Sequence, residues 1–162
     1  MAGGDEDDPG DPAYWNKFLG EGHTPFEPEP EHKPTVETFH SLYSAVLANY
    51  DYACALTGKR FDPPDALLHE DLKIAPIKPL PQGGPLHVRN FLCLTDEADL
   101  AFRSGHISVG PGWELIADLS RVDPELLERL NPIGRLRLPA TEVSRPDPDL
   151  MRFHRERIFL NH

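Results

Sequence analysis

Hydrophobic positions recur with helical spacing in the segment from Val36 to Tyr50. The apolar side chains follow an i, i+3, i+4, i+7, i+8 pattern, at Phe39, Leu42, Tyr43, Val46 and Leu47. Such a stripe predicts an amphipathic helix with one buried face. We expect this helix to end near Asn49.

Short apolar runs separated by glycine and proline follow this helix. Runs at 52–58, 72–77 and 91–94 predict strands or extended segments. Pro76 lies inside the second run, and proline removes a hydrogen-bond donor from a strand ladder. We therefore expect that strand to lie at a sheet edge or to break there. The segment 79–85 contains three prolines and two glycines, which predicts a loop.

Short helices and strands alternate through the rest of the chain. Thr95 or Asp96 is expected to cap a helix that runs through Phe102, with Leu100 and Phe102 facing inward. The other expected elements are a hairpin, a short helix, a strand and a last helix, at 106–118, 124–130, 135–138 and from 147 onward.

Charge divides the chain into two parts. The full chain carries a formal charge of -11. Residues 1–35 hold nine acidic and two basic side chains and so contribute -7 to this charge. This segment is also rich in proline and glycine, so it cannot bury enough apolar surface to offset its chain entropy. We expect an acidic N-terminal tail at 1–35 and one folded domain at 36–162.

A short aromatic segment interrupts the tail. Asp11-Pro12 is typical of a helix N-cap followed by proline at the first helical position, and helical spacing then gathers apolar side chains on one face: Tyr14, Trp15, Phe18 and Leu19. The segment is interpreted either as a docking peptide for another protein or as a short helix packed on its own domain.

Composition excludes several classes of protein. The negative charge argues against a general nucleic-acid binder and against an anionic membrane surface as partner. No apolar run approaches the roughly 20 residues that span a bilayer, and the N-terminus lacks the features of a signal peptide, so we expect a cytoplasmic protein. Cys54 and Cys93 are too few for a disulfide framework or a four-cysteine zinc site, and buried, reduced thiols are expected.

An ordered set of segments between Phe39 and about Leu119 resembles the HNH nuclease domain, in the branch common among bacterial HNH restriction-type enzymes. The family has Cys-x-x-Thr-Gly, Ala-His-Ile-x-Pro, Asn-Gly-Leu-Leu-Leu and His-x-x-Phe-Asp-x-Gly, which are matched here by Cys54–Gly58, Ala75–Pro79, Asn90–Leu94 and Asp99–Gly105. The final segment, 148–159, resembles the C-terminal helix of the same enzymes.

The resemblance implies an α+β fold with an HNH-type ββα-metal (His-Me finger) core, flanking helices and a β-hairpin. In that family the ββα unit holds one divalent metal; the first His is the general base, the Asn organises the loop and the second His helps to hold the metal. Here Pro76 and Asp99 occupy the two His positions, while Asn90 is kept. Proline cannot accept a proton from water, and metal-assisted hydrolysis needs both the nucleophile and the ion.

We therefore expect a pseudo-nuclease without a cofactor, which acts as a binding or structural subunit and contacts a protein partner through residues 1–35. An active HNH endonuclease is the alternative, with His87 as a relocated base and Mg²⁺ or another divalent metal on Asp96, Glu97 and Asp99. Carboxylates near a helix N-terminus are also favoured by the helix dipole without any metal. A third possibility is an acidic DNA-mimic or inhibitor protein.

Two other features have a structural and a functional interpretation each. The last helix carries Arg152, Arg155 and Arg157 together with His154, which could contact phosphate or could form a solvated face that pairs with neighbouring carboxylates. Trp113 follows Gly-Pro-Gly and could be an exposed anchor for a partner, or could cover the core from the hairpin.

Overall fold

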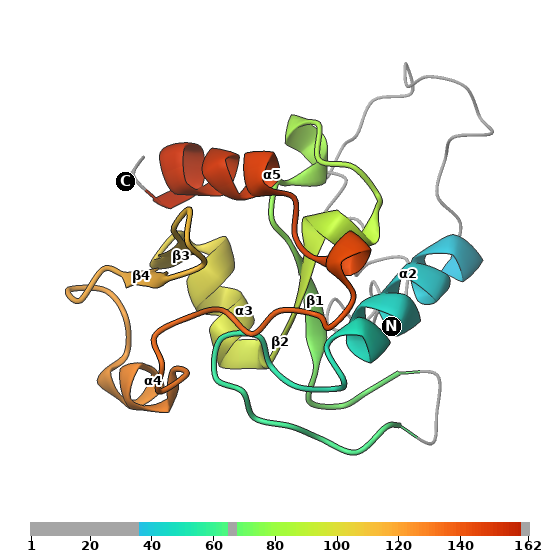
Figure 1. The fold of residues 1–162 in the computed structure, drawn as a ribbon, viewed down its shortest axis with the longest axis horizontal. Helices are drawn as coiled ribbons and strands as arrows, with labels where there is room; N and C mark the ends of the chain where they lie inside the picture. Colours follow the sequence, from blue (N-terminus) through green and yellow to red (C-terminus); the bar gives the residue numbers. More distant parts are fainter. Residues whose placement is uncertain (1–35, 65–67, 160–162) are drawn as a thin grey trace, which may run out of the picture.

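The chain folds into short helices and two small antiparallel sheets. The computed structural model describes residues 36–64 and 68–159. The whole acidic tail, residues 1–35, lies outside these residues. The predicted docking segment in it is therefore outside them too (Tyr14, Trp15, Phe18 and Leu19). Helices and strands are mixed along the described chain, so the fold class is α+β, as expected (Figure 1). Among the described helices, none has the length and apolar character needed to cross a membrane.

The first helix of the domain confirms the prediction from the hydrophobic stripe. Helix α2 (Val36–Asn49) buries Tyr43 and Val46 on the face that packs against the central sheet. The helix stops because Asp51 and Tyr52 follow it with φ values of 55° and 58°. This left-handed conformation is costly for residues other than glycine and cannot continue a right-handed helix.

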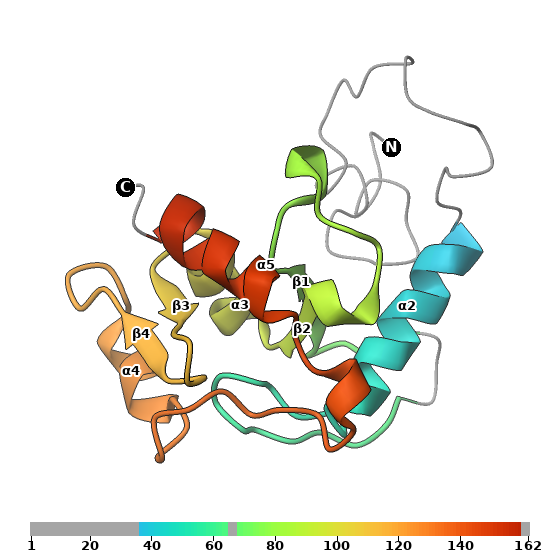
Figure 2. The same ribbon diagram turned by 45° about the horizontal axis from the view of Figure 1, so that its top comes forward.

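A two-stranded antiparallel sheet forms the centre of the domain. Strand β1 (Lys73–Pro76) pairs with strand β2 (Phe91–Leu94), and the register places Pro76 opposite Phe91 at the end of the ladder. Pro76 therefore ends its strand, as predicted. All residues of both strands are buried because the sheet lies between α2 and α3 (Figures 1 and 2). Burial on both faces explains why the strands are apolar without alternation, apart from Lys73 at the start of β1.

Helix α3 (Asp96–Arg103) follows β2 directly and completes a β-β-α unit. Ala98 and Phe102 are fully buried against the sheet, whereas Leu100 is 61% exposed. The prediction that Leu100 faces inward is therefore wrong. Leu100 lies two residues from each buried position, which is about 200° around an α-helix.

A hairpin and a short helix extend the fold beyond α3. Strand β3 (Ile107–Val109) pairs with β4 (Leu115–Ala117), which confirms the predicted hairpin. Helix α4 (Pro124–Arg129) follows, and the Asp123 side chain caps it by accepting a hydrogen bond of 2.9 Å from the Glu125 N–H.

The C-terminal helix runs over the hairpin. Helix α5 (Pro148–Phe153) starts after Asp147, whose carboxylate accepts a hydrogen bond from the Asp149 N–H at 2.9 Å. The helix continues as a π-helical segment at His154–Phe159, which packs against β3. Its start agrees with the prediction from the Asp-Pro pair.

Two segments predicted as extended are not strands. Residues 52–58 form turns with one isolated bridge, and residues 135–138 make one bridge, from Arg135 to Glu114. The Ala55 backbone explains both departures, because its N–H donates to the Cys93 carbonyl and its carbonyl accepts from the Arg137 N–H. These two hydrogen bonds connect the loop at 52–58 to strand β2 and to the segment at 135–138, and neither bond extends a β-ladder. Both cysteines are buried and free, as expected.

Candidate functional site

The position of the expected general base is filled by the ring of Pro76. This residue is buried at the end of β1, and the next residue, Ile77, donates its N–H to the Asn90 carbonyl at 2.7 Å. The proline ring has no titratable group and no side-chain donor. The strand therefore ends in a backbone hydrogen bond beside an apolar ring, and Pro76 cannot act as a base.

Asn90 ties the loop between the two strands together. Its side chain is fully buried; Oδ1 accepts from the Lys78 N–H at 2.8 Å, and Nδ2 donates to the carbonyls of Lys78 and Pro85 at 3.0 and 3.1 Å. One amide therefore satisfies three backbone groups across the loop. This is the loop-organising task that the resemblance implies for this position.

Gly84 allows the loop to close around this amide. A Cβ at Gly84 would lie 1.9 Å from the Lys78 carbonyl oxygen and 2.8 Å from Asn90 Nδ2. The backbone therefore approaches Lys78 more closely than any side chain would permit. The glycine–proline composition of 79–85 serves this close packing.

Asp99, at the second expected His position, is held by an arginine one turn along α3. The residue is 7% exposed, and its two carboxylate oxygens accept from Arg103 Nε and Nη2 at 2.8 and 2.9 Å. This bidentate arrangement is the favoured geometry of a guanidinium and a carboxylate. The Asp99 carboxylate is therefore already neutralised by a fixed cation.

His87, the relocated-base candidate, caps a turn of 3₁₀ helix at Val88–Asn90. Its ring is exposed, and Nδ1 accepts a hydrogen bond from the Arg89 N–H at 3.1 Å. This local interaction gives the imidazole a structural task in the loop.

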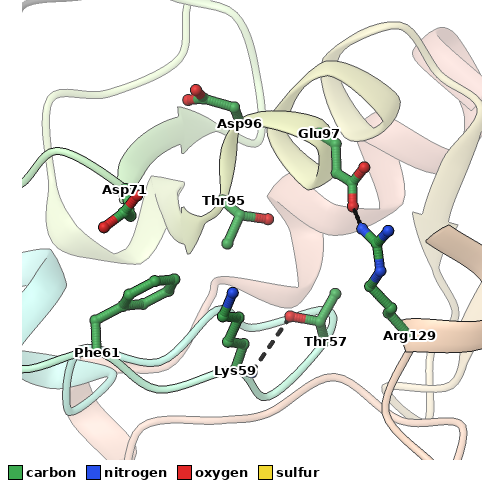
Figure 3. A pocket seen from close by; sticks show the side chains of 8 residues that line it. All are labelled: Thr57, Lys59, Phe61, Asp71, Thr95, Asp96, Glu97 and Arg129. Atoms are coloured by element: carbon green, nitrogen blue, oxygen red, sulfur yellow. Dashed lines mark hydrogen bonds and ion pairs between the residues drawn. The ribbon is translucent and has the colours of Figure 1, made fainter. Parts of the chain in front are cut away.

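The other two candidate carboxylates lie at an open pocket at the start of α3. Glu97 pairs with Arg129, and Asp96 lies 3.8 Å from the ammonium of Lys73. The pocket has a volume of about 600 Å³, and Lys59 and Phe61 line it from the opposite loop (Figure 3). Each carboxylate thus has a basic partner on a different element.

The carboxylates of α3 do not assemble with other ligands into a metal site. In the ranges 36–64 and 68–159, no group of three or more His, Cys, Asp or Glu side chains comes together in a way that could hold a metal ion. The structure instead brings each of Asp96, Glu97 and Asp99 next to a basic side chain, Lys73, Arg129 and Arg103 respectively.

A buried histidine links the C-terminal segment to α3. His154 is 1% exposed and stacks on Phe102 with ring centroids 3.8 Å apart. Its Nδ1 lies 2.7 Å from Ser108 Oγ and its Nε2 lies 2.8 Å from the Phe102 carbonyl oxygen. A neutral ring satisfies both contacts, with Nε2 donating to the carbonyl and Nδ1 accepting from the hydroxyl.

The environment of His154 opposes protonation. The pKa of His154 is lowered to about 4, chiefly by burial; the hydrogen bond to the Phe102 carbonyl acts in the opposite direction, and the charge of Arg155 contributes to the lowering. The interpretation of His154 as a phosphate contact or part of a solvated face beside the arginines is wrong, because the ring is buried. Its i, i+3 spacing from the buried Met151 was the available signal.

The comparisons with known proteins support a nuclease-like fold. A solved structure described as "Modification dependent TagI restriction endonuclease" matches with a TM-score of 0.55 and 22% sequence identity, over 73% of this chain and 37% of that chain. No family model matches the sequence. No curated protein matches it either.

Proposed function

We propose that this chain carries a degenerate HNH-type nuclease domain that does not cleave nucleic acid and serves as a binding or structural subunit of a larger complex. The observation that carries the proposal is Pro76, a buried proline at the strand end where the family places its general base. Without a group that accepts a proton, water at this position is not activated.

The arrangement of β1, β2 and α3 supports the HNH-type assignment. The two strands pair, the helix follows and packs on them, and Asn90 closes the intervening loop through three hydrogen bonds. These are the parts that the ββα unit of the family requires. The proposed domain thus retains the structural parts of the unit, namely the two strands, the helix and the loop asparagine.

The metal side of the unit supports loss of activity. A carboxylate at position 99 could ligand a hard cation, but the bidentate pair with Arg103 already neutralises its charge. Binding a divalent ion there would first require the guanidinium to move. A single occupied carboxylate is a poor metal site.

The role as a subunit rests on the acidic tail. A nuclease-like domain without its base offers a folded scaffold, and the aromatic segment of the tail offers a surface for a protein partner (Tyr14, Trp15, Phe18 and Leu19). Aromatic side chains dominate the binding energy of many protein interfaces.

A nicking assay on supercoiled DNA tests the proposal. The purified full chain is incubated with Mg²⁺ and, separately, with Mn²⁺, beside the variants Asp99→Ala, His87→Ala and, as a control outside the proposed unit, Asp62→Ala. We expect no cleavage by any of the four proteins. Cleavage that Asp99→Ala or His87→Ala abolishes and Asp62→Ala leaves intact would show an active relocated site and overturn the proposal.

A further inference from the structure

Two features that the proposed function leaves unused lie at one pocket. The pocket has a volume of about 200 Å³ and lies between the β3–β4 turn and the C-terminal helical segment. Trp113 lines it from the turn, while Arg152 and Arg155 line it from the helix. Trp113 and the two arginines are 39 or more positions apart in the sequence. They line one pocket because the C-terminal helical segment packs on β3 (Figure 1).

The backbone of Trp113 is held in an unusual conformation. Its φ value is 67°, in the left-handed region that bulky residues rarely adopt. The Trp113 N–H donates to the Gly110 carbonyl at 2.9 Å, and the Trp113 carbonyl accepts from the Leu136 N–H at 2.8 Å. The turn therefore holds the half-buried indole at the pocket at a conformational cost.

The two arginines give the pocket two guanidinium groups. Arg155 is half-buried, and its Nη1 donates to the Val109 carbonyl at 2.9 Å, which anchors the guanidinium beside the turn. Arg152 is exposed and lies 3.6 Å from the Asp149 carboxylate. A second carboxylate lies in the turn itself, where Glu114 Oε1 accepts from the Gly112 N–H at 2.8 Å.

We infer that this pocket binds one nucleotide of a single-stranded nucleic acid, with the base against Trp113 and the phosphate on Arg152 and Arg155. Indole rings stack on bases of any sequence, and guanidinium groups pair with phosphate through two parallel hydrogen bonds. The volume is below the range of about 300–1,000 Å³ typical of drug-sized ligands, which fits a single base.

The inference stands apart from the proposed function, because binding a strand requires no cleavage and uses none of Pro76, Asn90 or Asp99.

The fluorescence of Trp113 provides a direct test. The chain has two tryptophans, so full-length protein with Trp15→Phe reports on Trp113 alone. Titration with a short oligothymidylate should quench this emission. An abasic oligonucleotide of the same length should bind at least about tenfold more weakly, since it offers phosphates without a base to stack.

Substitutions in the full-length chain test the two halves of the site, with a labelled oligothymidylate followed by anisotropy. Trp113→Ala should weaken binding about tenfold. Arg152→Gln should weaken binding and reduce the slope of log affinity against log salt by about one. Because Arg152 is exposed, this variant keeps the test decisive if Trp113→Ala fails to fold. The matched control, Arg129→Gln, removes the same charge from α4 and should leave the affinity for the oligothymidylate and its salt dependence unchanged.

Three results would each overturn the inference. The first is equal affinity for the abasic and the base-bearing strand, and the second is absence of any change in Trp113 emission. The third is an equal loss for Arg129→Gln and Arg152→Gln, which would indicate general charge attraction. None of these results alters the outcome of the nicking assay, so the two proposals fail separately.

Discussion

At the scale of single residues, Asn90 has a structural task in the loop between β1 and β2. Its amide satisfies Lys78 and Pro85 from inside the loop, and none of these contacts depends on the residue at position 76. A buried polar group is costly only when its partners are lost. The loop therefore keeps Asn90 whether or not a base stands at the strand end.

Replacement of Asn90 by alanine should destabilise the fold. Three backbone groups lose their partner in a buried place, which is expected to lower the free energy of unfolding by about 3 kcal/mol. Urea denaturation of Asn90→Ala measures the loss. His87→Ala, in the same loop but exposed, is the control and should cost less than about 1 kcal/mol. Equal stability of the two variants would contradict the described role.

His154 predicts a pH dependence of stability. In the unfolded chain its pKa is about 6.5, and in the folded chain burial lowers the pKa to about 4. Between these values the unfolded state binds more protons, so the free energy of unfolding falls as the pH is lowered from about 6.5 to about 4. The loss amounts to about 3 kcal/mol, and this group adds no further loss below pH 4.

Urea denaturation between pH 6.5 and pH 4 separates the contribution of His154 to the pH dependence of stability from the contributions of other groups. His154→Gln keeps hydrogen-bonding atoms but does not titrate, so its stability should fall less steeply between pH 6.5 and pH 4 than that of the unaltered chain. Identical slopes for the two proteins would show that His154 is protonated in the folded state at the same pH as in the unfolded chain.

At the scale of elements, the loop between β1 and β2 depends on close backbone approach. Gly84→Ala would push a methyl group against the Lys78 carbonyl and should lower the free energy of unfolding by about 2 kcal/mol or more. Gly112→Ala is the matched control, because there the nearest atom is the end of the flexible Glu114 side chain at 3.1 Å. A larger loss for Gly112→Ala would contradict this account.

The sequence predicted the elements that local patterns decide and missed contacts made across the chain. The stripe in α2, the apolar runs of β1 and β2 and the Asp-Pro start of α5 all agree with the structure. Residues 135–138 did not form a strand, because whether a short extended segment joins a ladder depends on a partner elsewhere in the chain.

The residues of the candidate site also fall into those that the sequence predicts and those that only the folded chain brings together. Pro76 and Asn90 could be placed from the order of segments, and the i, i+4 spacing of Asp99 and Arg103 is a known signal for an ion pair. The stacking of His154 on Phe102 joins positions 52 residues apart. No periodicity in a single sequence reports such a contact.

At the scale of the whole molecule, the composition of residues 1–35 predicts a tail that adds little to the core, because a segment so rich in acidic residues, proline and glycine buries little apolar surface. In the part of the chain that the structure describes, the buried core residues run from Phe39 to Met151. A chain of residues 36–162 should therefore unfold cooperatively, with a melting temperature within about 3 °C of the full chain, which corresponds to a change below about 1 kcal/mol. Circular dichroism measures both proteins. A chain that lacks 1–35 and melts without a cooperative transition would place the domain boundary elsewhere.

The pair of Asp99 and Arg103 has a consequence for how this lineage can change. If the domain descends from an active nuclease, a single substitution at position 76 was enough to end catalysis. Regaining activity would need more changes, namely a base at 76, a ligand at 99 and a different residue at 103. Replacement of Arg103 alone would break its bidentate pair with the buried Asp99 carboxylate. Under the proposed function, the Asp99–Arg103 pair is thus one of the features that a return to activity would have to undo.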